Sequence, residues 1–131
     1  MYPDSADSYL RLLRAIDRSR FAVHLDVVNL VASPRLFYGN AALIRECVAT
    51  LGPYIKSCHV KDIAIAERLT LHLDEIRPGL GGGDHAAYLR EVATLHPDTP
   101  FMLEHLESAE AYALAAGRLR AVAQREGVPL L

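Results

Sequence analysis

The sequence predicts an α/β fold in which helices alternate with the strands of a parallel sheet. Three short apolar segments have the composition of buried strands, and stretches with helical periodicity separate them. Each strand-like segment carries a metal-capable side chain near its end, namely Asp26, His59 and Glu104. Parallel strands place their carboxyl ends at one edge of a sheet, where α/β enzymes hold their active sites, so we expect these three side chains to converge.

The first half of the chain is predicted to hold two helices and two strands, in alternation. Their ranges are residues 3–17, 21–28, 41–51 and 55–61. The first helix has a single apolar stripe, and Asp4 or Ser5 can cap its start. The stripe comprises Tyr9, Leu12, Leu13 and Ile16. Gly52 and Pro53 end the second helix, as a glycine and a proline after an amphipathic segment commonly do.

The second half is predicted to hold an extended excursion, a loop, and a last pair of helices around a last strand. Leucines alternate with polar residues at 67–74, and the glycine-rich segment 77–83 follows as a flexible loop over the strand ends. Asp84 can cap a helix, residues 101–106 form the last strand, and a final helix starts at Ser108. The alternation of the whole chain is that of a parallel α/β sheet.

The composition is typical of a globular protein, and its charge makes small molecules the expected partners. It has 131 residues, enough for one domain, with 51% hydrophobic and 23% charged residues and a formal net charge of −2. We therefore expect neither nucleic acid nor an anionic membrane as a partner. Two cysteines outside any C-x-x-C motif argue against a disulfide framework, and no apolar run approaches a membrane span, so we expect a cytoplasmic protein.

The strand alternation predicts one polar and one apolar face for the sheet. Side chains two residues apart share a face, so His24 accompanies Asp26, Lys61 accompanies His59, and Met102 accompanies Glu104. The other face is apolar and suits packing under helices: Val23, Leu25, Val27, Cys58, Val60, Phe101 and Leu103. A closed parallel barrel has such an outer face, while its inner face opens into the active site.

Four motifs, in this order, resemble the sugar phosphate isomerase and epimerase family, which has a xylose isomerase-like TIM barrel. They are His-Leu-Asp-Val-Val-Asn at 24–29, Cys-His-Val-Lys-Asp at 58–62, Arg-Pro-Gly-Leu-Gly at 77–81 and Leu-Glu-His-Leu at 103–106. The resemblance implies that residues 1–131 are the C-terminal half of a (β/α)8 barrel, with about three core strands and four helices. The family's first metal carboxylate would precede Tyr2, so the resemblance also implies a truncated or split enzyme.

The same resemblance implies a site and a reaction. Asp26, His59 and Glu104 would bind a divalent metal, Mn²⁺, Mg²⁺, Co²⁺ or Zn²⁺, and Glu104 would also be the catalytic acid and base. Contacts to the substrate would come from Asn29, where many relatives have a histidine, and from Lys61 and Arg77. The reaction would be isomerisation or epimerisation of a sugar or sugar phosphate, with proton transfer beside a keto group through an enediolate.

The resemblance also implies partners for the incomplete barrel. The strand at residues 22–28 should lack one parallel neighbour, and an unpaired edge favours association. We therefore expect a homo-oligomer or association with a missing N-terminal half, and little activity from the isolated chain.

Other readings of these residues remain open. Asp26, His59 and Glu104 could cap helices or bind loop amides. Asn29 could be a turn residue, Lys61 could be a solvated cation, and Arg77 could lie at the surface. The chain could be a catalytically inert half-barrel that serves in assembly. It could also be related to the abasic-site endonucleases, although Asn29 and the absence of a basic surface count against that.

The remaining histidines are predicted to have structural or surface roles. His105 should point away from Glu104 toward the helices, and His24 should be packed in the interior. His72, His85 and His96 lie in the excursion, at a helix start and at a helix end, where exposure to solvent is the expectation.

Overall fold

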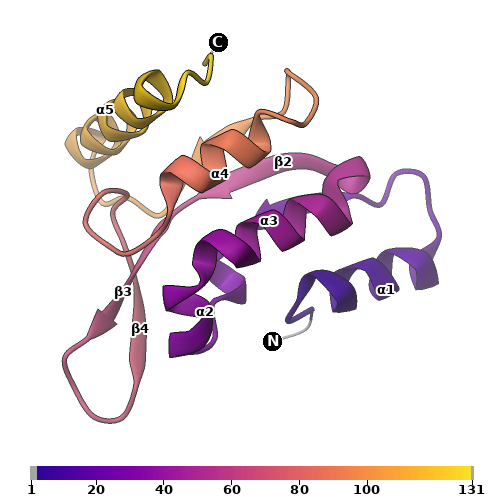
Figure 1. The fold of residues 1–131 in the computed structure, drawn as a ribbon, viewed down its shortest axis with the longest axis horizontal. Helices are drawn as coiled ribbons and strands as arrows, with labels where there is room; N and C mark the ends of the chain where they lie inside the picture. Colours follow the sequence, from indigo (N-terminus) through magenta and orange to yellow (C-terminus); the bar gives the residue numbers. More distant parts are fainter. Residues whose placement is uncertain (1–2, 131) are drawn as a thin grey trace.

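A computed structural model describes residues 3–130, which form a three-stranded parallel sheet, a β-hairpin and five α-helices (Figure 1). The parallel sheet comprises β1 (Val23–Asp26), β2 (Ile55–Val60) and β5 (Phe101–Leu103), and the hairpin comprises β3 (Asp62–Ala66) and β4 (His72–Ile76). The helices are α1 (Ala6–Ile16), α2 (Pro34–Tyr38), α3 (Asn40–Leu51), α4 (His85–Val92) and α5 (Ala109–Glu126), with 3-10 turns η1 (Val28–Leu30) and η2 (Gly52–Tyr54). The predicted α/β class with three parallel strands is confirmed.

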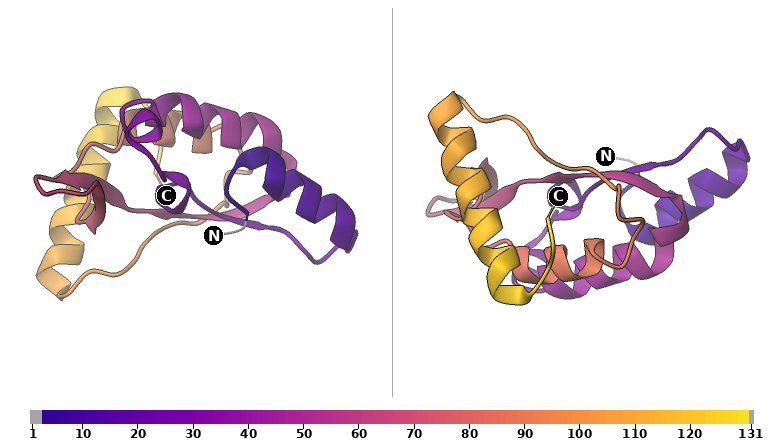
Figure 2. Two further views of the ribbon diagram at one scale, coloured as in Figure 1. Left: turned by 90° about the horizontal axis from the view of Figure 1, so that it is seen from below. Right: turned by 90° about the horizontal axis from the view of Figure 1, so that it is seen from above.

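The sheet has the two unlike faces that the sequence predicts. Its strand order is β1-β2-β5 with all pairs parallel, and Figure 2 shows α3 and α4 on the same side of it. The side chains toward these helices belong to the main apolar core, among them Val23, Leu25, Cys58 and Val60. The face turned away from α3 and α4 carries the polar side chains of the candidate site. This is the division between helix side and inner side of a parallel barrel.

The helix boundaries follow from local side-chain chemistry. Ser5 caps α1 and forms a reciprocal pair of hydrogen bonds with Ser8, which selects Ser5 over Asp4 as the cap. Asp84 and Ser108 accept hydrogen bonds from backbone amides in the first turns of α4 and α5, as predicted. Gly127 ends α5 in the left-handed conformation, with φ of 68°. These caps hold the two helices that follow the candidate site in place.

The structure differs from the sequence prediction at three elements. The prediction missed α2, whose start is set by Ser33 as cap and Pro34 as first residue. It missed β3, which begins one residue after β2, and the extended segment predicted at 67–74 is in part β4, which pairs with β3 as an antiparallel hairpin. It extended the last strand to residue 106, whereas β5 ends at Leu103. Only Lys61 separates β2 from β3, and no change in composition marks the boundary between the two strands in the sequence.

A buried carboxylate holds the glycine-rich segment that the sequence predicts as a flexible loop. Asp62, which is 1% exposed, accepts hydrogen bonds from the backbone N–H groups of Ile63, Gly79, Gly81 and Gly83 at 2.8–3.0 Å. Asp62 directly follows Lys61, so the same segment of chain fixes the loop and presents Lys61 to the candidate site. The hydrogen bonds from Gly79, Gly81 and Gly83 to Asp62 therefore anchor the loop beside the strand ends.

Gly81→Ala is expected to destabilise the fold by about 1–3 kcal/mol, because the added methyl group would overpack the contact between the 77–83 loop and Asp62. A Cβ atom at Gly81 would lie 2.4 Å from the carbonyl oxygen of Ile63 and 2.5 Å from Asp62 Oδ1. Gly117→Ala is the matched control: a Cβ there meets no atom within 4 Å, and the replacement should stabilise α5 by up to about 1 kcal/mol. Urea denaturation of both variants measures the difference, and equal stabilities would contradict the packing described here.

Both outer strands of the described sheet have a free edge, because β1 pairs only with β2 and β5 pairs only with β2. Beside β5, the strand, α4 and α5 line a groove of about 760 Å³ that includes Phe101, Leu103, Leu119 and Val128. Within residues 3–130, no helix has both the length and the apolar character needed to cross a membrane.

Candidate metal centre

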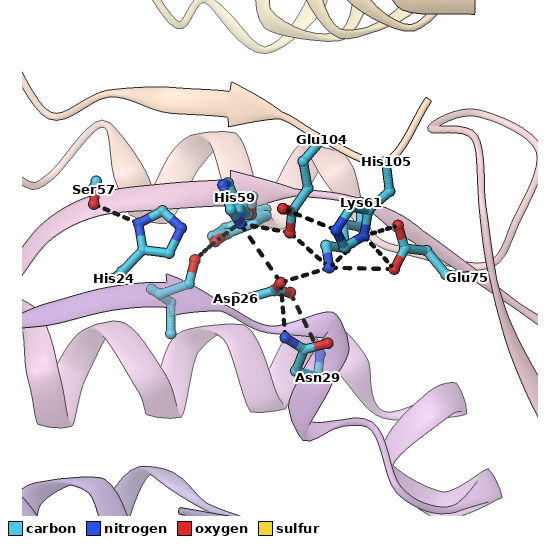
Figure 3. Close-up of polar contacts among 11 residues, drawn as sticks. His24, Asp26, Asn29, Ser57, His59, Lys61, Glu75, Glu104 and His105 are labelled. Atoms are coloured by element: carbon cyan, nitrogen blue, oxygen red, sulfur yellow. Dashed lines mark hydrogen bonds and ion pairs between the residues drawn. The ribbon is translucent and has the colours of Figure 1, made fainter. Parts of the chain in front are cut away.

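Asp26, His59 and Glu104 come together at the carboxyl ends of the three parallel strands (Figure 3). Asp26 is the last residue of β1 and lies opposite His59 in the register, while His59 lies opposite Met102 in β5. Glu104 therefore follows on the same face, two residues after Met102. One ligand atom from each side chain lies within 4.8 Å of the others, and each residue is partly buried. The parallel register thus brings together the three residues that the sequence singles out.

The ammonium group of Lys61 lies among the carboxylates of this cluster. Its Nζ atom is 3.0 Å from Asp26 Oδ2, 2.7 Å from Glu104 Oε1 and 3.2 Å from Glu75 Oε2. The Lys61 side chain is only 3% exposed, so these ion pairs are shielded from water. The reading of Lys61 as a solvated cation is therefore wrong.

The electrostatics of the cluster favour its charged forms. Burial opposes ionisation of Glu104, but the hydrogen bond and charge of Lys61, together with His59 and His105, hold the pKa of Glu104 below its usual value. Burial likewise opposes charging of Lys61, but hydrogen bonds to Glu104, Asp26 and Glu75 raise its pKa above the usual lysine value. The lowered pKa of Glu104 favours the ionised carboxylate, which is suited to a cation.

Neighbouring groups hold the three side chains in position. Asn29 in η1 donates from Nδ2 to Asp26 Oδ2 at 2.9 Å, so it orients that carboxylate. His59 Nδ1 lies 2.6 Å from Glu104 Oε1 and 3.8 Å from Asp26 Oδ2. From the helix side, the Tyr88 hydroxyl of α4 is 3.0 Å from the carbonyl oxygen of His59 and 3.2 Å from that of Leu25. The strand ends are therefore fixed from both faces of the sheet.

His105 and Glu75 belong to this network, and sequence reasoning misplaced the first and missed the second. His105 Nδ1 lies 3.0 Å from Glu75 Oε1, and its Nε2 lies 3.3 Å from Glu104 Oε2. The predicted alternation fails at His105 because β5 has ended and this residue has a positive φ of 56°. Glu75 comes from β4, and only the pairing of β4 with β3 carries it back to the site.

The other candidate residues lie at the margins of the cluster. Arg77 follows β4 and lines a cavity of about 530 Å³ together with Glu75 and His105. His24 is exposed, not packed in the interior as predicted, with its Nδ1 atom 2.5 Å from Ser57 Oγ and its ring edge-on to that of His59. His85 is buried, not exposed as predicted, and its Nε2 atom lies 3.0 Å from the carbonyl oxygen of Lys61.

A parallel sheet with helices on one face and a polar cluster at its carboxyl edge defines part of a TIM barrel of the xylose isomerase type. The solved structure that carries this assignment is a xylose isomerase domain protein from Planctomyces limnophilus, with a TM-score of 0.71 and 22% sequence identity. The similarity covers 94% of this chain and 45% of that protein, so the chain spans less than half of its length. No protein-family model and no curated protein matches the chain.

Proposed function

We propose that this chain carries part of the active site of a divalent-metal-dependent sugar isomerase or epimerase, with Asp26, His59 and Glu104 as metal ligands. The observation that supports the proposal most directly is the convergence of the three ligand atoms within 4.8 Å of one another. Ligands about 2.0–2.3 Å from one ion lie within about 4.6 Å of each other, so a small movement of the side chains suffices. The xylose isomerase-like fold supports the same reaction class.

The residues present suit such a metal. Two carboxylates and an imidazole are hard and borderline donors, the set that Mn²⁺, Mg²⁺, Co²⁺ and Zn²⁺ accept. The Lys61 ammonium, bound to oxygens of Asp26 and Glu104, supports the view that these oxygens are arranged around a positive charge. A bound divalent cation would polarise the carbonyl group of a keto sugar and favour loss of the neighbouring proton.

The chain's own side chains would bind the substrate and move the proton. Glu104 is the acid and base in this proposal, because its carboxylate is ionised and lies at the polar edge of the sheet. Asn29, Lys61 and Arg77 are the proposed contacts to oxygens of the sugar or sugar phosphate. Arg77 lines the cavity next to the cluster and could receive an anionic group at the far end of such a substrate.

We further propose that the chain acts together with additional β/α units, supplied within a longer polypeptide, by a separate half-barrel or by a second copy. The free edges of β1 and β5 are where further parallel strands would pair, and the apolar groove beside β5 would receive their helices. The remaining length of the solved xylose isomerase domain protein supports this proposal. If no such units restore turnover, the chain is to be regarded as a catalytically inert half-barrel.

Titration with Mn²⁺ tests the metal centre. The protein is expected to bind one ion, and His59→Ala should weaken the affinity by about 100-fold or more, because even the loss of groups that only orient a ligand costs about 10–100-fold. The matched control is His96→Ala, since the His96 side chain is 74% exposed and outside the cluster. Isothermal titration calorimetry gives both dissociation constants. Equal binding by the wild type and His59→Ala, with both folded by circular dichroism, would refute the proposed ligand set.

A further inference from the structure

We propose that Lys61 is an exchangeable internal cation, which holds Asp26 and Glu104 together until a divalent metal displaces it, and that Glu75 receives its ammonium group after displacement. This inference rests on the proposed metal centre and adds a competitor and an acceptor to it. Lys61 thereby sets the affinity of the site and couples metal binding to the β3–β4 hairpin, which carries Glu75.

The first step of the argument is that Lys61 uses the oxygens that a metal would need. Its Nζ atom is 2.7 Å from Glu104 Oε1 and 3.0 Å from Asp26 Oδ2, while His59 Nδ1 faces the same two oxygens from 2.6 Å and 3.8 Å. The imidazole and the ammonium group thus converge on one pair of carboxylate oxygens (Figure 3). Without the ammonium group, the negative charges of Asp26 and Glu104 would lie close together with no lysine between them.

The second step is that a metal and the ammonium group cannot both keep these contacts. An ion about 2.3 Å from Glu104 Oε1 would lie no more than about 5 Å from the Lys61 Nζ atom, given the 2.7 Å distance in the structure. Repulsion between a divalent and a monovalent cation at that distance is strong where solvent screening is weak, and the Lys61 side chain is 3% exposed. Metal binding therefore requires that the ammonium group move away.

The third step is that an acceptor is already in contact. Glu75 Oε2 lies 3.2 Å from Lys61 Nζ and is the partner on the side away from β1. Glu75 is outside the Asp26, His59 and Glu104 set, and its side chain is 35% exposed, so it has room to follow the lysine. Lys61 can thus leave the metal ligands without becoming an unpaired buried charge, which would be costly.

The first test is the Lys61→Met variant of the whole protein, titrated with Mn²⁺. Removal of the competing cation should tighten Mn²⁺ binding on the order of tenfold and should lower the melting temperature in EDTA by several degrees, because two neighbouring carboxylates then lack their counter-ion. Saturating Mn²⁺ should restore the melting temperature. The matched control is Lys56→Met, which removes an exposed lysine from β2, the strand that precedes Lys61, and should change neither quantity. Lys61→Gln repeats the test if the methionine variant aggregates.

The second test is a double-mutant cycle with Glu75→Gln. In the wild-type background this substitution should weaken Mn²⁺ binding about tenfold, because the displaced ammonium group then lacks its acceptor. In the Lys61→Met background it should have no effect. An equal loss in both backgrounds would show that Glu75 acts on the metal directly and would overturn the exchange.

The outcomes separate the two proposals. If the wild type and Lys61→Met bind Mn²⁺ with equal affinity, and His59→Ala weakens this binding, the exchange is refuted and the metal centre stands. Binding by Lys61→Met alone would support the exchange in its strongest form. Failure of both proteins to bind, with both folded, would refute the metal centre and the exchange with it.

Discussion

Glu104→Gln is expected to reduce keto-sugar turnover to background in protein that has its full complement of barrel strands. Glu104 is the proposed acid and base as well as a ligand, and general acid–base catalysis contributes about 10²–10⁴-fold. Its Oε1 atom also contacts both His59 and Lys61, so the amide would disturb two further groups of the site. The loss should therefore reach or exceed the upper end of that range.

The assay compares residues 1–131 alone with the same chain fused to, or co-expressed with, a complementary half of a xylose isomerase-like barrel, both supplied with Mn²⁺. The isolated chain should show a rate near background, since the resemblance places the family's first metal carboxylate on a strand before Tyr2. Glu46→Gln is the control in the completed protein, because Glu46 is exposed on α3. If the isolated chain turns over keto sugars, and Glu104→Gln leaves that rate unchanged, the chemistry lies elsewhere.

Asp62→Ala is expected to lower the free energy of unfolding by several kcal/mol, because each buried amide that is left without its acceptor costs about 1–3 kcal/mol. Asp62 accepts four backbone hydrogen bonds, and a charged acceptor strengthens each of them. Its loss would leave the amides of the 77–83 loop without that acceptor. Since globular domains are stable by only about 5–15 kcal/mol, this is a large share of the total.

Urea denaturation measures this loss against Asp98→Ala, a matched replacement of a carboxylate whose side chain is 80% exposed. Asp62→Asn should fall between the two, because the amide side chain keeps one acceptor oxygen. If Asp62→Ala and Asp98→Ala unfold at the same urea concentration, the carboxylate does not hold the loop as the structure indicates.

The elements that the sequence predicts well are those whose signals are local. The apolar stripe of α1, the caps Asp84 and Ser108 and the composition of β1 and β2 all depend on residues close to one another in the chain. The polar and apolar faces follow from strand alternation, which is why Asp26, His59 and Glu104 could be placed on one face before the structure was known. Strand alternation places these three side chains correctly because each residue lies in a strand or one residue beyond it.

The sequence by itself determined the α/β class, the order of the main helices and strands, and the three side chains that converge at the carboxyl edge of the sheet. Only the tertiary structure decided that Lys61 lies between two of those carboxylates, that Glu75 and His105 join them, and that Asp62 holds the glycine loop. These contacts join residues from 14 to 44 positions apart, through the β3–β4 pairing and the end of β5. Periodicity describes neighbours along one element, whereas the partner of a buried charge is set by which elements pack together.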